Sequence, residues 1–167
     1  MNAIAPLKPS AARSQDAKVF IVEDDHAVSD SLSQLLGMQG YRTSSFPSAE
    51  AFLAALSPDS SGCAILDIRL PGVSGLELQA TLTERHIDLP VIIITGHGDT
   101  RNSRAAFKAG AVDFLEKPID ADALLQAVAA CMDAGERRQR DRAEHSELET
   151  RLQRLTQREN EVLDLVL

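Results

Sequence analysis

Five short apolar runs alternate with five helix-like segments between residues 18 and 133. The runs span residues 19–22, 42–46, 63–66, 91–94 and 112–115. Short apolar runs separated by helical patterns are typical of parallel strands that are buried under helices on both faces of a sheet. We therefore expect an α/β fold, a doubly wound open sheet of five parallel strands built from five βα units. The second run is the least apolar and is expected at an edge.

The segments between the runs repeat apolar residues every three or four positions, as one buried face of a helix requires. The repeating residues are Val28, Leu32, Leu35 and Leu36, then Ala49, Phe52, Leu53 and Leu56, then Leu76, Leu78 and Leu82, then Ala105, Ala106 and Ala109, and finally Leu124, Leu125, Val128 and Cys131. Ser48 is a predicted N-cap, and Gly40 and Gly110 are predicted to end the helices before them. The last helix is predicted over residues 120–132.

Composition limits what such a domain can bind. The formal net charge of −8 disfavours nonspecific binding of nucleic acid by the whole chain. No apolar run reaches the roughly 18–20 residues that a membrane span needs, and Cys63 and Cys131 form neither a zinc motif nor a disulfide framework. We expect a cytoplasmic protein without a membrane partner, in which residues 1–17 are a disordered lead-in.

Chemically reactive side chains follow four of the five predicted strands. Doubly wound sheets bind their ligands outside the carboxyl ends of the strands, so these side chains are expected to meet there. The residues are Glu23, Asp24 and Asp25 after the first strand, Asp67 after the third, Thr95 after the fourth and Lys117 after the fifth. Each alone is an ordinary loop or helix-start residue. Their joint placement predicts a common site.

The chemistry of this set favours a metal and a phosphoryl group. Neighbouring carboxylates repel one another unless they share a cation, and oxygen ligands of this kind suit Mg²⁺. Thr95 can donate a hydrogen bond to a phosphoryl oxygen, and the Lys117 ammonium can offset its charge. Asp67 is then the candidate nucleophile, because a carboxylate can form an aspartyl phosphate.

Residues 18–133 resemble the receiver domain of two-component response regulators, which has a CheY-like, flavodoxin-like fold. Four motifs carry the resemblance: V-E-D-D at 22–25, L-D-I-R-L-P-G-V-S-G at 66–75, I-T-G-H-G-D at 94–99 and K-A-G-A-V-D-F-L-E-K-P at 108–118. The resemblance implies a phosphorelay protein that accepts a phosphoryl group from a sensor histidine kinase. It implies a phosphoacceptor with slow self-dephosphorylation rather than an enzyme.

The resemblance also assigns roles to individual residues. Asp67 is the implied phosphoacceptor, and Mg²⁺ is held by Glu23, Asp24, Asp67 and the backbone carbonyl of Arg69. Thr95 and Lys117 are the switch hydroxyl and the phosphate-binding lysine, and Phe114 is the aromatic switch residue. The Lys117-Pro118 bond is expected to be cis. Phosphorylation is expected to reshape the face formed by the helix near 105–109 and the strand at 112–115, and so to promote homodimerisation.

The tail after residue 133 has a different pattern. Residues 134–154 are predicted to form a helical linker that extends the last receiver helix. Leu148, Leu152 and the following Leu155 have the four-then-three spacing of a coiled-coil seam, through which this helix could pair in a dimer. A solvated helix laced with ion pairs explains this stretch equally well. Thr156 and Glu159 predict a capping box that opens a new helix. The string L-T-x-R-E-x-E-V-L at 155–163 is similar to the start of a LuxR-type helix-turn-helix domain, inside which the chain ends.

Three alternatives remain at this level. A receiver can act through protein contacts alone, although the string at 155–163 favours a regulator that binds DNA through its C-terminal domain and controls transcription. A phosphohydrolase of the haloacid-dehalogenase type would need a second Asp where Arg69 stands. A flavin-binding flavodoxin would not place the three acids of residues 23–25 where its phosphate must bind.

Overall fold

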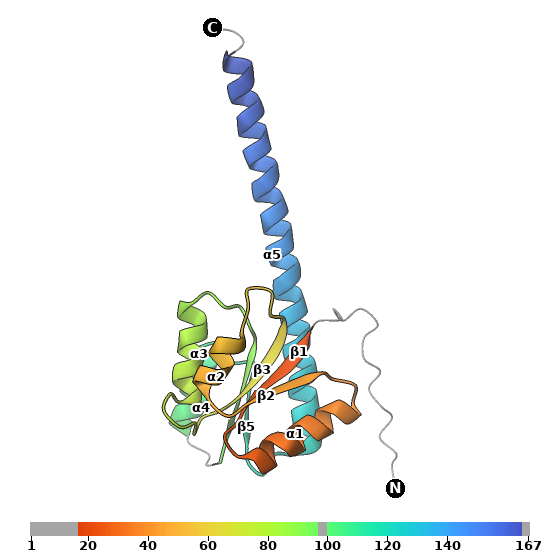
Figure 1. The fold of residues 1–167 in the computed structure, drawn as a ribbon, viewed down its shortest axis with the longest axis vertical. Helices are drawn as coiled ribbons and strands as arrows, with labels where there is room; N and C mark the ends of the chain where they lie inside the picture. The colour runs from red at the N-terminus through yellow and green to blue at the C-terminus, as the bar shows by residue number, and fades with distance from the viewer. Residues whose placement is uncertain (1–16, 97–99, 165–167) are drawn as a thin grey trace. The chain divides into compact units, whose positions relative to one another are not determined.

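The computed structural model describes residues 17–96 and 100–164 (Figure 1). Residues 1–16 of the expected lead-in, residues 97–99 of the third motif and the last three residues lie outside the described residues. The chain divides into two compact units, residues 1–136 and residues 137–167, and each is described by itself. In the described ranges, none of the helices combines the length and the apolar character that crossing a membrane would require.

The first unit is a five-stranded parallel sheet in the order β2-β1-β3-β4-β5. Its elements alternate along the chain as expected (Figure 1). They are β1 (Lys18–Val22), α1 (His26–Met38), β2 (Thr43–Phe46), α2 (Ala49–Ala55), β3 (Gly62–Asp67), α3 (Gly75–Glu84), β4 (Val91–Thr95), α4 (Thr100–Lys108), β5 (Asp113–Glu116) and the beginning of α5 (Ala121–Asp164). The doubly wound α/β fold is confirmed, and β2 lies at an edge as predicted.

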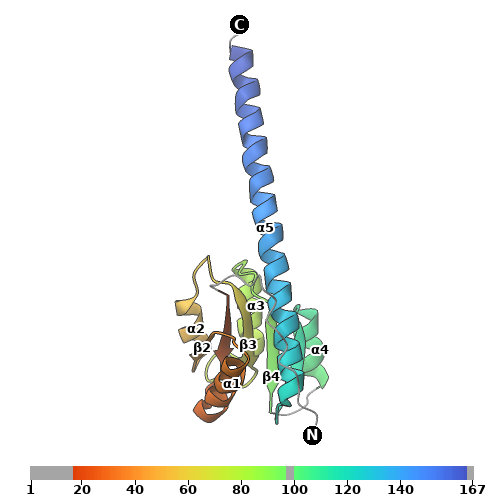
Figure 2. The ribbon, with the colours of Figure 1, turned by 90° about the vertical axis from the view of Figure 1, so that its right-hand side faces the viewer.

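Two apolar clusters cover the two faces of the sheet. Successive strand residues point to opposite faces, so that in β1 Val19 and Ile21 join one cluster and Phe20 and Val22 the other. The first cluster includes residues of α1 and α5, and the second includes residues of α2, α3 and α4. Figure 2 shows the beginning of α5 crossing the sheet on the same side as α1.

Side-chain caps fix where several helices begin. Ser48 accepts a hydrogen bond from the backbone of Ala51, which confirms the predicted N-cap of α2. Ser74 and Glu77 form a complete capping box at the start of α3. Gly40 and Gly110 follow α1 and α4 with positive φ angles of 84° and 89°, as residues that end helices often have.

Helix α5 joins the last predicted helix of the receiver to the predicted helical linker. It runs from Ala121 to Asp164, so the predicted helix over 120–132 continues without interruption through the predicted linker. The capping box predicted at Thr156 and Glu159 is wrong, because the Thr156 hydroxyl lies within the helix and donates to the carbonyls of Leu152 and Gln153. The intervening residues contain no Pro, and apart from Gly135 many of them are good helix formers such as Glu, Arg, Gln and Leu, so the helix continues past this threonine.

Candidate phosphoryl and metal site

The strand register brings the acidic residues together. Val22 lies opposite Leu66 in the pairing of β1 with β3. The next residues, Glu23 and Asp67, are therefore neighbours at the carboxyl ends of two adjacent strands. Since β1 and β3 flank the point where the strand order reverses, this is the edge where doubly wound sheets bind ligands.

Three carboxylates meet at this edge. Glu23, Asp24 and Asp67 each offer one oxygen, and these oxygens lie within 4.8 Å of one another. Glu23 and Asp67 are buried, with 2% and 3% of their surface exposed, whereas Asp24 is exposed. The predicted acidic pair thus lies beside the predicted phosphoacceptor.

Asp25 has a different task from its two acidic neighbours. Its side chain caps α1, because Oδ1 accepts hydrogen bonds from the backbone amides of Ala27 at 2.9 Å and Val28 at 3.3 Å. Its own amide donates to Glu23 Oε1 at 3.0 Å. Asp25, which the resemblance does not assign to the metal, is thus used as the cap of α1.

Lys117 bridges the two buried acids. Its Nζ lies 2.8 Å from Glu23 Oε2 and 3.1 Å from Asp67 Oδ2. The backbone of Lys117 is fixed by a hydrogen bond from its amide to the carbonyl of Thr95, at 2.7 Å, which ties the segment after β5 to the end of β4. The Lys117-Pro118 bond is cis, as the resemblance implies.

The ionisation of this group reflects burial and mutual contact. Burial raises the pKa of Glu23, and the nearby charge of Asp67 raises it further. The hydrogen bonds from Lys117 and from the Asp25 amide lower this pKa but do not cancel the rise. Burial opposes the charge on Lys117, but its hydrogen bonds to Glu23 and Asp67 outweigh burial and raise its pKa. With all groups ionised, three carboxylates against one ammonium leave a formal charge of −2.

This donor set fits a small hard cation. Two of the carboxylates are buried, and one lysine offsets only part of their charge. Mg²⁺ prefers oxygen ligands and binds proteins through few carboxylates while it keeps several waters. The exposed Asp24 leaves the cluster open to solvent on one side, as a site that must admit a hydrated ion requires.

Asp67 is held from two sides. Its Oδ1 accepts a hydrogen bond from the Arg69 amide at 3.2 Å, and its Oδ2 faces Lys117. Gly75 at the start of α3 lies directly behind its main chain, and its amide donates to the carbonyl of Ile68. A Cβ atom at Gly75 would lie 2.2 Å from the Asp67 carbonyl oxygen. The motif S-G at 74–75 contained this residue, but only the close approach of α3 to β3 reveals its role.

Thr95 and Phe114 lie on the neighbouring strands β4 and β5. Thr95 is buried at the end of β4, opposite Glu116 of β5. Phe114 is half-buried and packs against the cluster that contains Ala106 of α4. The two predicted switch residues therefore lie on the strands that flank α4 in the chain.

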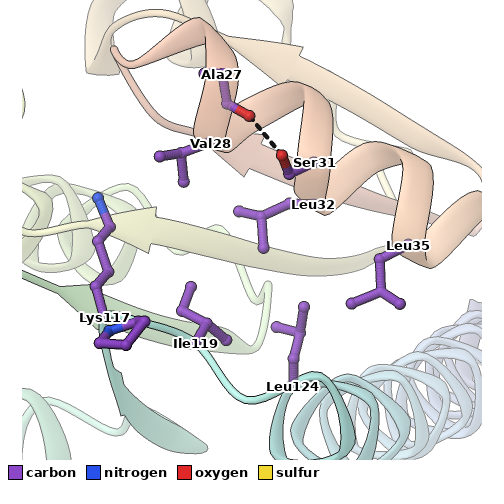
Figure 3. A pocket seen from close by; sticks show the side chains of 9 residues that line it. Ala27, Val28, Ser31, Leu32, Leu35, Lys117, Ile119 and Leu124 are labelled. Atoms are coloured by element: carbon purple, nitrogen blue, oxygen red, sulfur yellow. Dashed lines mark hydrogen bonds between the residues drawn. The ribbon is translucent and has the colours of Figure 1, made fainter.

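An apolar pocket of about 370 Å³ lies between α1 and the segment from Lys117 to Leu124. Figure 3 shows Val28, Leu32 and Leu35 of α1 facing Ile119 and Leu124. The side chain of Lys117 borders this pocket, while its Nζ bonds to the acids. The lining of this pocket is mainly apolar and therefore suits apolar groups.

Comparison with known proteins agrees with this arrangement. The pattern of the response regulator receiver domain matches residues 19–129. The response regulator protein TmoT of Ectopseudomonas mendocina is 39% identical over 153 residues, which are 92% of this chain and 70% of TmoT. The transcriptional regulatory protein FixJ of Azorhizobium caulinodans is 42% identical over 146 residues, 87% of this chain and 69% of FixJ.

Solved structures show the same likeness. The response regulator StyR superposes with a TM-score of 0.77 at 38% identity, over 81% of this chain and 68% of StyR. The structure named FixJ-N has a TM-score of 0.66 at 42% identity, over 72% of this chain and 96% of its own length. The chain thus spans roughly two thirds of TmoT, FixJ and StyR.

Proposed function

The chain belongs to the response regulator receiver family of two-component systems, and from this membership we propose that Asp67 is its phosphoacceptor. Members of this family are phosphorylated on an aspartate. The observation that carries the assignment is the contact between a buried carboxylate at the end of the central strand β3 and the Lys117 ammonium, 3.1 Å away.

The residues around Asp67 would have distinct roles in the transfer of the phosphoryl group. One carboxylate oxygen of Asp67 forms a bond to phosphorus while the bond from phosphorus to the kinase histidine breaks and the imidazole leaves. Lys117, now bound to Glu23 and Asp67, is within reach of the new phosphoryl oxygens and offsets their charge. Thr95 at the end of β4 supplies its hydroxyl as a hydrogen-bond donor to the same group.

We assign Mg²⁺ to Glu23, Asp24, Asp67 and the backbone carbonyl of Arg69. The first three offer oxygens within 4.8 Å of one another. When bound, the ion would neutralise the negative charge that gathers where an anionic phosphoryl group approaches a carboxylate. The protein's own contribution is to hold the acceptor rigidly through the Arg69 amide and the close contact of Gly75.

Phosphorylation converts the Asp67 carboxylate into a group that carries about −1.5 to −2 charges, by analogy with other phosphorylated residues. Thr95 and Lys117 would move toward the new charge, and Phe114 and α4 would follow. Moving a population from about 1:99 to 99:1 needs about 5.5 kcal/mol, which a few charge-assisted hydrogen bonds can supply. The face of α4 and β5 is then the output surface, used for homodimerisation. The family relation supports a phosphoacceptor that is not an enzyme, and slow self-dephosphorylation is part of the proposal.

The similarity to FixJ suggests what the whole protein regulates once it is phosphorylated. FixJ is named a transcriptional regulatory protein, and this chain matches 69% of its length. We infer that the protein regulates transcription by binding DNA through a C-terminal LuxR-type domain, of which residues 155–167 are the beginning. Residues 18–133 are then the receiver and residues 134–154 the helical linker. A receiver that acts only through protein contacts is the alternative, and specific DNA binding by the full-length regulator would exclude it.

Labelling with acetyl phosphate tests the assignment. The chain should take up phosphoryl groups with Mg²⁺, and excess chelator should prevent uptake. Asp67→Asn should abolish labelling, whereas Asp113→Asn should keep it, since Asp113 begins β5 at the other end of the sheet. Equal labelling of the parent and Asp67→Asn would refute the assignment, and steady turnover of small phosphoesters would instead identify a phosphohydrolase.

A further inference from the structure

Three leucines form an exposed stripe on the second unit. Leu148, Leu152 and Leu155 of α5 are 56%, 61% and 57% exposed. Their spacing of four and then three places them on one side of the helix. Every residue from 139 to 159 is exposed, and most are polar, so the stripe is the apolar surface of this segment. Leucines in such a row are stabilised when a second helix covers them.

The charges beside the stripe decide which helix can cover it. In a heptad with Leu148 and Leu155 at d and Leu152 at a, the flanking g positions hold Glu144, Arg151 and Arg158. The flanking e positions hold Arg142, Glu149 and Thr156. These flanking side chains meet the partner helix in a coiled coil and set its direction.

A parallel partner of the same sequence is disfavoured. In that arrangement each g residue meets the e residue five positions later on the other helix. Within residues 144–158, Glu144 would face Glu149, and this contact occurs twice by symmetry, while Arg151 would face the uncharged Thr156. The parallel dimer of this segment therefore carries two like-charge contacts and no attractive one.

An antiparallel partner fits better. With Leu148 of one helix opposite Leu152 of the other, all three leucines of each copy are covered, since Leu155 packs against His145. In antiparallel pairs, g residues meet g residues, so Glu144 faces Arg158 twice. Like charges remain only where Glu149 and Arg151 each meet their own copy at the two-fold axis. The antiparallel pair thus has two attractive contacts beside its two repulsive ones, whereas the parallel pair has two repulsive contacts and no attractive one.

We propose that residues 144–158 of α5 associate with the same segment of a second copy in an antiparallel pair, with Leu148 opposite Leu152. This surface is separate from the α4 and β5 face and needs no phosphorylation. Its last residues, 155–158, overlap the proposed beginning of the C-terminal domain, so the pair is proposed for this 167-residue chain, in which they continue α5. Two heptads bury little surface, and helical segments this short are marginal alone. The pair is therefore weak and depends on protein concentration.

Sedimentation equilibrium of the unphosphorylated chain over a range of concentrations tests the proposal. Leu152→Ala should weaken association by roughly tenfold, because each copy loses a central leucine. Glu144→Arg and Arg158→Glu should each weaken it by roughly three- to tenfold, and the double variant should restore it. These two positions lie about 21 Å apart on one helix, so restoration must act between copies.

The effect of Glu144→Arg on association distinguishes an antiparallel pair from a parallel one. Glu144→Arg weakens an antiparallel pair but strengthens a parallel one, where the substituted side chain would meet Glu149. Glu147→Arg is the matched control, since it makes the same charge change at an outward position and also lies four residues from an Arg. The proposal would be overturned if the chain did not associate, or if Glu144→Arg strengthened its association. It would also be overturned if the double variant did not recover the parent's association, or if Glu147→Arg weakened association as much as Glu144→Arg does.

Discussion

The Nζ of Lys117 lies 3.1 Å from Oδ2 of Asp67, although the two residues are 50 positions apart in the chain. The same ammonium lies 2.8 Å from Glu23 Oε2. One cation thus holds two buried acids that would otherwise repel each other. Any cation or phosphoryl group that enters the site must change this contact, so the bridge couples the occupancy of the site to the segment that follows β5.

Replacing Lys117 with Met should destabilise the protein and impair phosphorylation. Glu23 and Asp67 would keep their burial but lose their shared cation, and we expect the free energy of unfolding to fall by about 1–3 kcal/mol at neutral pH. Added Mg²⁺ should recover part of this loss. Urea denaturation measures both effects, with Lys18→Met at the opposite end of β1 as control. An unchanged unfolding midpoint would show that the bridge has no role in stability.

Gly75→Ala should disturb the site without touching any of its charged groups. The added Cβ would lie 2.2 Å from the Asp67 carbonyl oxygen, so α3 or the end of β3 must move. We expect lower stability and slower labelling by acetyl phosphate. Gly37→Ala is the matched control, because nothing lies within 4 Å of its added Cβ on α1. That variant should be more stable by about 0.5–1 kcal/mol and label normally. Normal labelling of Gly75→Ala would contradict the support role of Gly75.

The capping box of α3 should make stability depend on pH. Hydrogen bonds from the backbone amide and hydroxyl of Ser74 lower the pKa of Glu77. The unfolded chain then binds this proton more readily than the folded protein does, so the contribution to stability is present above pH 4.5 and is lost as the pH falls through the lowered folded value. Ser74→Ala should cost about 1 kcal/mol at pH 7. The Glu77 contribution itself is measured with Glu77→Gln, whose stability curve should converge with that of the parent at acid pH, where Glu77 is protonated, and a constant difference would refute this origin.

Two substitutions of similar size at Gln79 should differ strongly in their effect on stability. Its Nε2 donates to the Ala106 carbonyl of α4 at 3.2 Å, while its buried Oε1 has no hydrogen-bond partner among the described residues. Gln79→Met removes the unpaired acceptor together with the bond, so we expect a change within about 1 kcal/mol. Gln79→Glu buries a charge and should cost several kcal/mol. Thermal unfolding at pH 7 distinguishes them, and similar losses in both would show that the site is not dry.

The sequence predicted the fold well because period and position are local signals. Apolar runs of four or five residues identify buried strands, and the ends of four of them hold Glu23, Asp67, Thr95 and Lys117, which a parallel sheet must bring to one edge. Contacts that depend on how closely two elements pack in three dimensions could not be predicted from the sequence pattern. The closeness of Gly75 to Asp67 and the unpaired Oε1 of Gln79 are examples. Thr156 shows the opposite error, since a capping pattern cannot tell a helix start from a helix interior.

Chemical mapping of the phosphorylated residue tests the central claim most directly. Borohydride reduces an aspartyl phosphate to homoserine, so the chain is treated with acetyl phosphate and Mg²⁺, reduced, digested and sequenced by mass spectrometry. We predict homoserine at position 67 and unmodified Asp at positions 24, 25 and 113. Homoserine at another of these positions, or none in a chain that has taken up phosphate, would contradict the assignment of Asp67 as the phosphoacceptor.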